Sequence, residues 1–315
     1  MPRLLVYWRA LRPFSFPASV FPTLTGNIAA AALHRHQTDF SFSLVNMLLT
    51  LIGAVAIHAT SNVLNDYYDW RSGLDRMDNS GRMNPLVRSE LSHRQMLALA
   101  AICGVIAVGI GAYVIALCGE PIVWIVAIGA ISTWAYTAPP LQLKYRGLGE
   151  LQVMLSFGVL MTLGSYIVQA RHVFTHEAEL SVLVLSLPQS LLIAAILHAN
   201  NHRDRRGDCS ARAVTLSVAL GIPQRSIVLG KLFVWGAYVV HGVAVVATLD
   251  SVYPIPAWTL VAWGTVPLAW RALIALDGSD DPASPLFERV VLLHARLQRI
   301  YGALMVLGLA VAAVG

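Results

Sequence analysis

The chain has 315 residues, of which 57% are hydrophobic and only 12% are charged. About a quarter of the residues are charged in a typical soluble domain, so this composition excludes an ordinary water-soluble globular protein. A net charge of +5 would favour nucleic acid as the partner of a soluble protein, but here the basic residues are distributed as in a membrane topology, and we expect no nucleic-acid partner. The sequence predicts an all-α, polytopic membrane protein in contact with the lipid bilayer.

Apolar segments of near-spanning length recur along the whole chain, because about twenty helical residues are needed to cross a bilayer core. The N-terminus lacks a short apolar core followed by a small-residue cleavage site, so the first membrane helix itself is expected to direct insertion. About nine transmembrane helices are expected, at 16–34, 43–64, 94–117, 121–138, 149–169, 180–200, 226–248, 255–276 and 297–315.

The basic residues fix the expected orientation. If the N-terminus is cytoplasmic, all but two of the 22 lysines and arginines lie in cytoplasmic segments, and only Arg35 and Arg171 lie outside. This asymmetry is the one that the positive-inside rule describes. The connections after the second and sixth helices are long and polar, so we expect the active site to face the cytoplasm, in the cytoplasmic membrane of a bacterium.

The second helix is followed by an acidic segment, Asn-Val-Leu-Asn-Asp-Tyr-Tyr-Asp at 62–69 and then Asp75. If the helix continues through Asp69, then Asn62, Asp66 and Asp69 lie on one face at positions i, i+4 and i+7. Carboxylates are costly near the hydrocarbon core, so such a cluster requires a compensating cation. The spacing therefore suggests a magnesium site.

A second acidic segment follows the sixth helix, at 200–208. On a continued helix, Asn200, Asp204 and Asp208 form one stripe at i, i+4 and i+8, and the two carboxylates could share one cation. Two such stripes facing each other would form a magnesium cage that a diphosphate completes. Arginines surround this segment and could contact phosphate directly: Arg203, Arg205, Arg206 and Arg212. The alternative is that both segments are polar loops in which carboxylates balance arginines.

The positions of the two acidic segments indicate an internal duplication. Each follows a membrane helix, and three helices lie between them. We therefore expect one membrane-embedded domain over 1–315, built from two quasi-repeated four-helix units around a cytoplasm-facing cavity. The units are expected at about 16–138 and 149–276, with a final helix at 297–315.

The motifs together resemble the UbiA superfamily of intramembrane prenyltransferases, and more narrowly its 1,4-dihydroxy-2-naphthoate branch in menaquinone biosynthesis. The first motif is carried by residues 65–69 with Gly73 and Asp75, and the second by 200–204 with Asp208. The stretch 136–150, Tyr-Thr-Ala-Pro-Pro-Leu-Gln-Leu-Lys-Tyr-Arg-Gly-Leu-Gly-Glu, is similar to the family's connection between the fourth and fifth helices. Residues 8–13 and the region of 164–169 are similar to the same branch.

The resemblance implies a magnesium-dependent transferase that moves a polyprenyl chain from its diphosphate to an aromatic acceptor. It implies that magnesium is held by five carboxylates that also count as catalytic: Asp66, Asp69, Asp75, Asp204 and Asp208. It also implies a larger set of substrate-binding residues: Asn62, Asn65, Arg88, Tyr136, Lys144, Tyr145, Arg146, Asn200, Asn201, Arg203 and Arg212. Among these, Arg88 and Arg146 are the candidates to anchor the acceptor's carboxylate.

Two departures from the branch pattern concern the acceptor. Arg212 and Ala213 stand where the branch usually has Gly-Lys, and Asn84-Pro85-Leu86-Val87-Arg88 stands where Gly-Pro-Leu-Arg is expected. With 1,4-dihydroxy-2-naphthoate the product would be demethylmenaquinone, formed with loss of carbon dioxide. The alternatives are another acceptor, such as 4-hydroxybenzoate, homogentisate or a specialised phenol or quinolone, and, more distantly, a membrane transporter.

Overall fold

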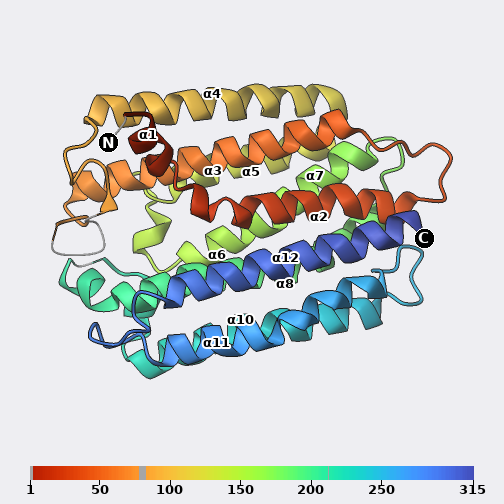
Figure 1. The fold of residues 1–315 in the computed structure, drawn as a ribbon. Helices are drawn as coiled ribbons and strands as arrows, with labels where there is room; N and C mark the ends of the chain where they lie inside the picture. The colour runs from red at the N-terminus through yellow and green to blue at the C-terminus, as the bar shows by residue number, and fades with distance from the viewer. Residues whose placement is uncertain (1–2, 78–82, 212) are drawn as a thin grey trace.

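The computed structural model describes residues 3–77, 83–211 and 213–315, and these residues form a bundle of long, roughly antiparallel helices. The two termini lie at opposite ends of the bundle (Figure 1). The connections after α3, α5, α8 and α11 all lie at the end where the chain begins. The helical, polytopic architecture predicted from the sequence is therefore confirmed.

The helices divide into two halves along the chain. The first half contains α1 (Arg3–Ala10), α2 (Pro17–His34), α3 (Leu44–Ser72), α4 (His93–Cys118), α5 (Glu120–Ala135) and the helix formed by α6 (Gly149–Val153), η4 (Met154–Leu160) and α7 (Met161–Ala170). The second half contains α8 (His176–Ser210), α9 (Leu216–Ala219), α10 (Pro223–Ala247), η5 (Ala257–Thr265), α11 (Val266–Asp277) and α12 (Val290–Val314). Short 3-10 turns, η1 (Pro13–Ser15) and η3 (Leu143–Tyr145), precede α2 and α6.

Among the described residues, seven helices are long and apolar enough to cross a membrane. An eighth span results if Arg3–Ser15 and Pro17–His34, which are bent by 57°, are taken together. The remaining expected segment, 121–138, forms α5, an apolar helix of 16 residues. At 1.5 Å per residue this helix is about 24 Å long, shorter than the roughly 30 Å hydrocarbon core.

Two of the helices extend beyond the apolar segments that the hydropathy marks. α3 starts at Ser43, whose hydroxyl accepts the backbone N–H of Asn46, and it ends at Gly73, where a left-handed φ of 76° suits glycine. α8 is capped by Thr175 and continues to Ser210. Both acidic stripes are therefore helical, as their spacing predicted.

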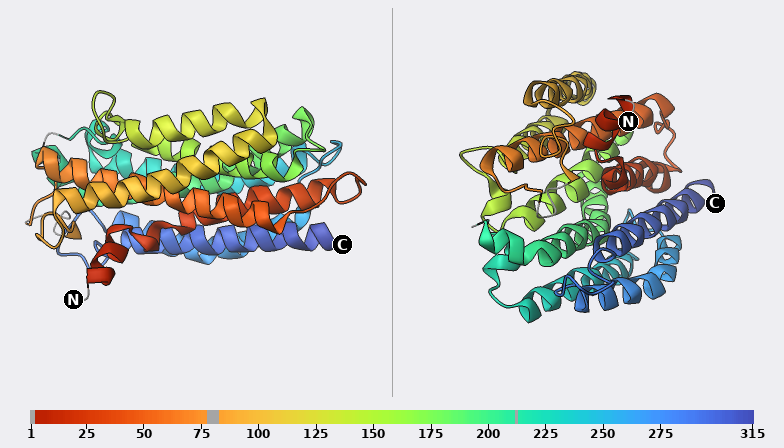
Figure 2. Two further views of the ribbon diagram at one scale, coloured as in Figure 1. Left: turned by 90° about the horizontal axis from the view of Figure 1, so that it is seen from above. Right: turned by 60° about the vertical axis from the view of Figure 1, so that its left-hand side comes forward.

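The core lies in the half of the bundle built around α8 and α12. Its buried side chains include Tyr166, Leu185, Leu192, Tyr301 and Met305, from α7, α8 and α12. α4 lies at one edge of the bundle and α11 at the opposite edge, as the right-hand view of Figure 2 shows. The outer face of α4 carries exposed aliphatic side chains, as expected of a helix surrounded by lipid. α8 is thus packed within the core, while α3 and α4 pack on one another beside it.

Candidate functional site

Asp69 is the most heavily bonded carboxylate at the end of α3. Its side chain is buried, and Lys144 Nζ donates to Oδ2 at 2.6 Å. Asn65 Nδ2 donates to the same oxygen at 2.9 Å, and Asn65 Oδ1 in turn accepts from Lys144 at 3.0 Å. The hydroxyl of Tyr145 donates to the other oxygen, Oδ1. One helix face and one loop therefore meet at this carboxylate.

Asp66 and Asn62 face the N-terminal segment instead. Asp66 is buried and forms an ion pair with Arg12, which lies in the turn between α1 and η1. Arg12 has a left-handed φ of 54°, a conformation that costs a non-glycine residue free energy and is concentrated at functional sites. One turn earlier on α3, Asn62 Nδ2 donates to the carbonyl of Leu11 and to Ser15 Oγ, each at 3.0 Å. These bonds fix the turn that presents the guanidinium.

Asp75 is brought back to α3 by Asn84. The Asn84 amide donates to Asp75 Oδ2 at 2.8 Å and to the backbone carbonyl of Asp66 at 2.7 Å. The backbone N–H of Asp75 also donates to the carbonyl of Asp69 at 3.2 Å. Burial, and next the negative charge of Asp69, raise the pKa of Asp75 above its usual value. Three predicted carboxylates thus lie close to one another at the end of one helix.

The second acidic stripe lies on the last turns of α8. Arg203 binds both oxygens of Asp204 at 2.8 Å and also donates to Asn200 Oδ1 at 2.9 Å. Asp208 accepts from Thr215 Oγ1 at 3.3 Å. Arg212, the remaining predicted phosphate contact of this segment, lies outside the described residues. Asp204 is therefore paired with an arginine of its own helix, whereas Asp208 bonds to a neutral hydroxyl.

The connection that contains Lys144 joins the two stripes. The backbone N–H of Lys144 donates to the carbonyl of Tyr136 at 2.9 Å. Two residues later, Arg146 forms an isolated parallel β-bridge with Val214, which follows the end of α8. Gly147, with a φ of 71°, lies close to the backbone of Leu216. The loop thus bonds to Asp69 on one side and is anchored beside the α8 segment on the other.

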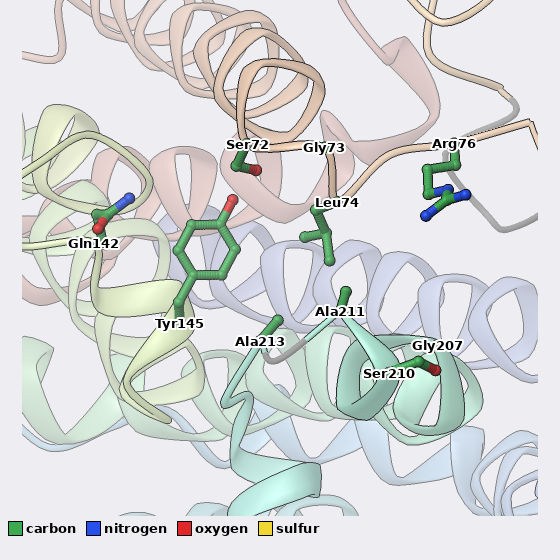
Figure 3. A pocket seen from close by; sticks show the side chains of 10 residues that line it. All are labelled: Ser72, Gly73, Leu74, Arg76, Gln142, Tyr145, Gly207, Ser210, Ala211 and Ala213. Atoms are coloured by element: carbon green, nitrogen blue, oxygen red, sulfur yellow. The ribbon is translucent and has the colours of Figure 1, made fainter.

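A cavity of about 480 Å³ opens between these elements. Figure 3 shows the hydroxyl of Tyr145 pointing from the loop toward Ser72 at the end of α3. Ala211 and Ala213, which follow α8, form part of the facing wall. The wall residues that bound this space are Ser72, Gly73, Leu74, Arg76, Gln142, Tyr145, Gly207, Ser210, Ala211 and Ala213. The cavity lies at the end of the bundle where both acidic helices terminate.

Burial and the charge of Asp69 determine the protonation states of the lysine and the two tyrosines at this loop. Burial acts to lower the pKa of Lys144, but the charge of Asp69 and the nearby phenols outweigh it, so the net pKa is raised and the ammonium is retained. Burial raises the pKa of Tyr145, and of Tyr136 to about 12. Both phenols are therefore neutral donors at neutral pH.

The donor set of the site fits magnesium in chemistry. Carboxylate and amide oxygens are the hard ligands that Mg²⁺ prefers, and Asp66 and Asp69 are almost completely buried. Burial, and next the negative charge of Asp69, raise the pKa of Asp75, and a bound cation would counteract this shift. Among the described residues, however, no three acidic, histidine or cysteine side chains already converge as metal ligands. Arg12, Lys144 and Arg203 hold these carboxylates instead.

Three predicted substrate-binding residues lie away from the carboxylates. Asn201 is buried behind the α8 stripe, where its amide donates to Glu150 Oε1 at 3.1 Å. Arg88 is paired with Glu90 at 2.9 Å. The exposed Arg146 donates to the carbonyl of Pro140 at 3.0 Å. Each of the two arginines thus has a partner within the chain.

Sequence reasoning gave no role to two residues that shape the site, Arg12 and Asn84, and it left Glu150 open between helix capping and a functional role. Arg12 was noted only within the family-like stretch 8–13, because no spacing rule links it to Asp66, 54 positions away. Asn84 occupies a position where the expected pattern has glycine, and that departure was the available signal. Glu150 receives hydrogen bonds from both His198 and Asn201, so it ties the start of α6 to α8 directly beneath the second stripe.

A second cavity, of about 470 Å³, lies between α2, α3, α4, α5 and the helix at 149–170. Its walls are mostly aliphatic, among them Ile57, Ile110 and Leu160, and the exposed Val108 at its edge indicates that it opens sideways out of the bundle. Ser61, one turn before Asn65 on α3, lines the same space. The apolar cavity therefore runs along the helix that carries the first acidic stripe.

Comparison with known proteins shows which family this chain resembles. The model of the UbiA prenyltransferase family matches residues 19–297. The 1,4-dihydroxy-2-naphthoate octaprenyltransferase of Bacillus subtilis is 25% identical over 307 residues, which are 96% of this chain and 92% of that protein. The corresponding Mycobacterium tuberculosis protein is 33% identical, over 83% of this chain and 82% of that one. The UbiA prenyltransferase domain-containing protein 1 homolog of Drosophila melanogaster is 32% identical, and the match spans 70% of this chain but only 59% of that protein.

Solved structures share the fold at low sequence identity. A UbiA homolog from Aeropyrum pernix K1 superposes with a TM-score of 0.69 at 18% identity, over 92% of this chain and 97% of that one. A UbiA homolog from Archaeoglobus fulgidus, bound to GPP and Mg²⁺, gives a TM-score of 0.64 at 17% identity, over 95% and 99%. The match of the family model over most of the chain decides the assignment: the chain belongs to the UbiA prenyltransferase family of integral membrane enzymes.

Proposed function

We propose that the protein transfers a polyprenyl chain from its diphosphate to 1,4-dihydroxy-2-naphthoate, forming demethylmenaquinone. The observation that carries the proposal is Lys144, whose ammonium binds Asn65 and Asp69 in the loop between two acidic helix ends. A fixed cation surrounded by carboxylates suits a diphosphate that arrives with its own metal. The A. fulgidus homolog bound to GPP and Mg²⁺ supports this type of ligand.

The proposed site is a two-sided clamp for the diphosphate. Asp66, Asp69 and Asp75 would hold magnesium from α3, and Asp204 and Asp208 would hold it from α8. When bound, magnesium supplies positive charge that lowers the cost of releasing diphosphate. No carboxylate needs to transfer a proton in this step, since the carbon–oxygen bond breaks with both electrons leaving on the diphosphate.

Basic residues of the chain would stabilise the same departure. Lys144 remains protonated and offers three donors, so it can retain Asp69 while binding a phosphate oxygen. Arg203 presents a planar fork that matches a phosphate as well as it matches Asp204. Both cations are already ordered by their carboxylate partners, which reduces the reorganisation that the reaction requires.

The apolar cavity would take the polyprenyl chain and protect the cation formed at its end. The space of about 470 Å³ has aliphatic walls and runs beside α3 toward Asn65. A water-poor wall keeps an allylic cation from hydrolysis until the aromatic ring attacks it. The ring carbon that bears the carboxylate would form the new carbon–carbon bond, and the carboxylate would leave as carbon dioxide.

The choice of acceptor rests on relatives. Proteins named as 1,4-dihydroxy-2-naphthoate octaprenyltransferases from B. subtilis and two mycobacteria match 83–96% of the chain at 25–33% identity. The basic residues that lie at the same end as the N-terminus support a cytoplasmic orientation of this end, in a bacterial cytoplasmic membrane. Arg88 and Arg146 remain the two candidates to anchor the acceptor's carboxylate, and either would have to exchange its present partner.

An acceptor screen tests the proposal. The purified protein in lipid nanodiscs is given octaprenyl diphosphate, Mg²⁺ and one acceptor at a time: 1,4-dihydroxy-2-naphthoate, 4-hydroxybenzoate or homogentisate. We expect diphosphate release and the demethylmenaquinone mass only with the naphthoate. Transfer to another of these rings instead would overturn the acceptor, and absence of diphosphate release with all of them would overturn the prenyl transfer itself.

A further inference from the structure

The apolar cavity contains a buried hydrogen-bond acceptor without a partner. Gln152 lines this cavity and is only 7% exposed. Its Nε2 donates to the carbonyl of Ser132 at 2.9 Å, which fixes the amide and leaves Oε1 free. Among the residues that the structure describes, Oε1 has no hydrogen-bond partner, and neither does Ser156 Oγ, one helical turn further along the same wall.

A buried carbonyl oxygen without a donor is unfavourable, and native proteins leave few such groups unexplained. A polyprenyl chain cannot satisfy it, because a hydrocarbon has no polar hydrogen. A carboxylate cannot satisfy it either, since its oxygens are acceptors and would repel Oε1. The group that fits is a hydroxyl, which donates to the amide oxygen and can accept from a serine.

The two polar groups lie at the part of the cavity nearest the acidic clamp. Gln152 lies three residues after Gly149, in the first turn of the helix that follows the Lys144 loop. Ser61, on the same cavity wall, precedes Asp69 by eight residues on α3, about 12 Å along the helix axis at 1.5 Å per residue. An aromatic ring beside Gln152 would thus lie at the clamp end of the cavity, next to a polyprenyl chain that enters its aliphatic part.

We propose that Gln152 and Ser156 form a subsite that recognises a ring hydroxyl of the aromatic acceptor. The ring hydroxyl donates to Gln152 Oε1, and Ser156 Oγ donates to the oxygen of the same hydroxyl. This orients the ring with its hydroxyl toward the helix at 149–170 and leaves its carboxylate free to point away from the amide oxygen. The inference rests on the proposed function, which supplies a hydroxylated aromatic acceptor.

The test compares ligands with and without the hydroxyl in wild type and in Gln152→Met. Methionine keeps the length and volume of glutamine but has no carbonyl acceptor. The probes are 1,4-dihydroxy-2-naphthoate and 2-naphthoate, measured by equilibrium binding in nanodiscs. We expect wild type to prefer the dihydroxy compound, and Gln152→Met to reduce this preference about tenfold, as the loss of one buried hydrogen bond does. The KM for octaprenyl diphosphate should be unchanged.

Two further variants keep the test independent of folding. Ser156→Ala removes only one oxygen atom, and it should reduce the preference by about threefold, less than Gln152→Met does. Gln152→Glu retains an acceptor at the same place, and it should keep more of the preference than methionine. An identical preference in wild type, Gln152→Met and Ser156→Ala would overturn the subsite, as would a raised KM for octaprenyl diphosphate alone.

The outcome also separates this inference from the proposed function. If the acceptor screen selects 4-hydroxybenzoate, the same comparison is made with 4-hydroxybenzoate and benzoate. Gln152→Met is then expected to reduce the preference for the hydroxylated ligand by the same factor. Transfer to the naphthoate with no effect of Gln152→Met would overturn the subsite and leave the proposed function intact. Absence of prenyl transfer to every acceptor would overturn both.

Discussion

Replacing Lys144 by methionine tests the bond between the loop and α3. Lys144 Nζ lies 2.6 Å from Asp69 Oδ2, and the exposed fractions of the two side chains are 16% and 4%. Removing one partner of a buried ion pair typically costs 3–5 kcal/mol, and we expect about 3 kcal/mol here because Asn65 and Tyr145 still bind the carboxylate. The free energy of unfolding in detergent, measured with EDTA present, reports this loss.

Magnesium should reduce the loss of stability in Lys144→Met, which is not expected if Lys144 has only a structural role. In Lys144→Met the negative charge of Asp69 is no longer balanced by a lysine, so Mg²⁺ should stabilise the variant more than it stabilises wild type. Prenyl transfer should still fall at least about 100-fold, since a cation that faces the leaving diphosphate is lost. The matched control is the chain's other lysine, Lys231, which pairs with Asp277 at 2.7 Å on the surface.

Lys231→Met should cost no more than about 1 kcal/mol and leave transfer intact, because exposed ion pairs contribute little. Equal losses of stability in the two variants would refute the reasoning, and so would a Lys144→Met protein that transfers prenyl groups at the wild-type rate.

Four further substitutions test the rest of the site. Asp69→Asn and Asp204→Asn should each reduce transfer at least about 100-fold while the protein remains inserted and folded, and wild-type turnover in either would contradict the clamp. Asn84→Ala should lower the free energy of unfolding by about 1–3 kcal/mol, because it removes the amide that donates to Asp75 and to the carbonyl of Asp66; a stability equal to wild type would exclude that role. Gly129→Leu should shift the preference toward shorter prenyl diphosphates, since Gly129 lines the apolar cavity and a Cβ there meets open space. The shift is measured as the ratio of kcat/KM for geranyl and octaprenyl diphosphate. An unchanged ratio would place the polyprenyl chain outside this cavity.

The sequence predicted the helices that matter because their signals are local. The spacing of Asn62, Asp66 and Asp69 fits one helix face if the helix continues through Asp69. α3 does continue, and it ends at Gly73 in the left-handed conformation that glycine tolerates. The stripe on α8 followed from the same helical spacing. α5 is shorter than expected, because apolar composition alone does not fix where a helix turns into its loop.

Contacts between distant segments could not be predicted in this way. Arg12 reaches Asp66 only because the chain turns sharply after α1, and no periodicity records that turn. Asn200 and Asn201 were both expected at the substrate, but neighbours on a helix point about 100° apart, so the two cannot share one face. Asn201 accordingly bonds to Glu150 in the interior. The apolar cavity with Gln152 depends on the packing of five helices and has no local signature.

Binding of an unreactive donor tests the clamp most directly. Geranyl S-thiolodiphosphate keeps the diphosphate charge, but its thiodiphosphate group is released from the geranyl carbon only slowly. Its affinity for the protein in nanodiscs can be measured by titration calorimetry with and without Mg²⁺. Because the clamp is proposed to have two sides, Asp69→Asn on α3 and Asp208→Asn on α8 should each weaken magnesium-dependent binding by at least about tenfold. Binding that is independent of Mg²⁺, or that is lost in only one of the two variants, would contradict a diphosphate site shared between α3 and α8.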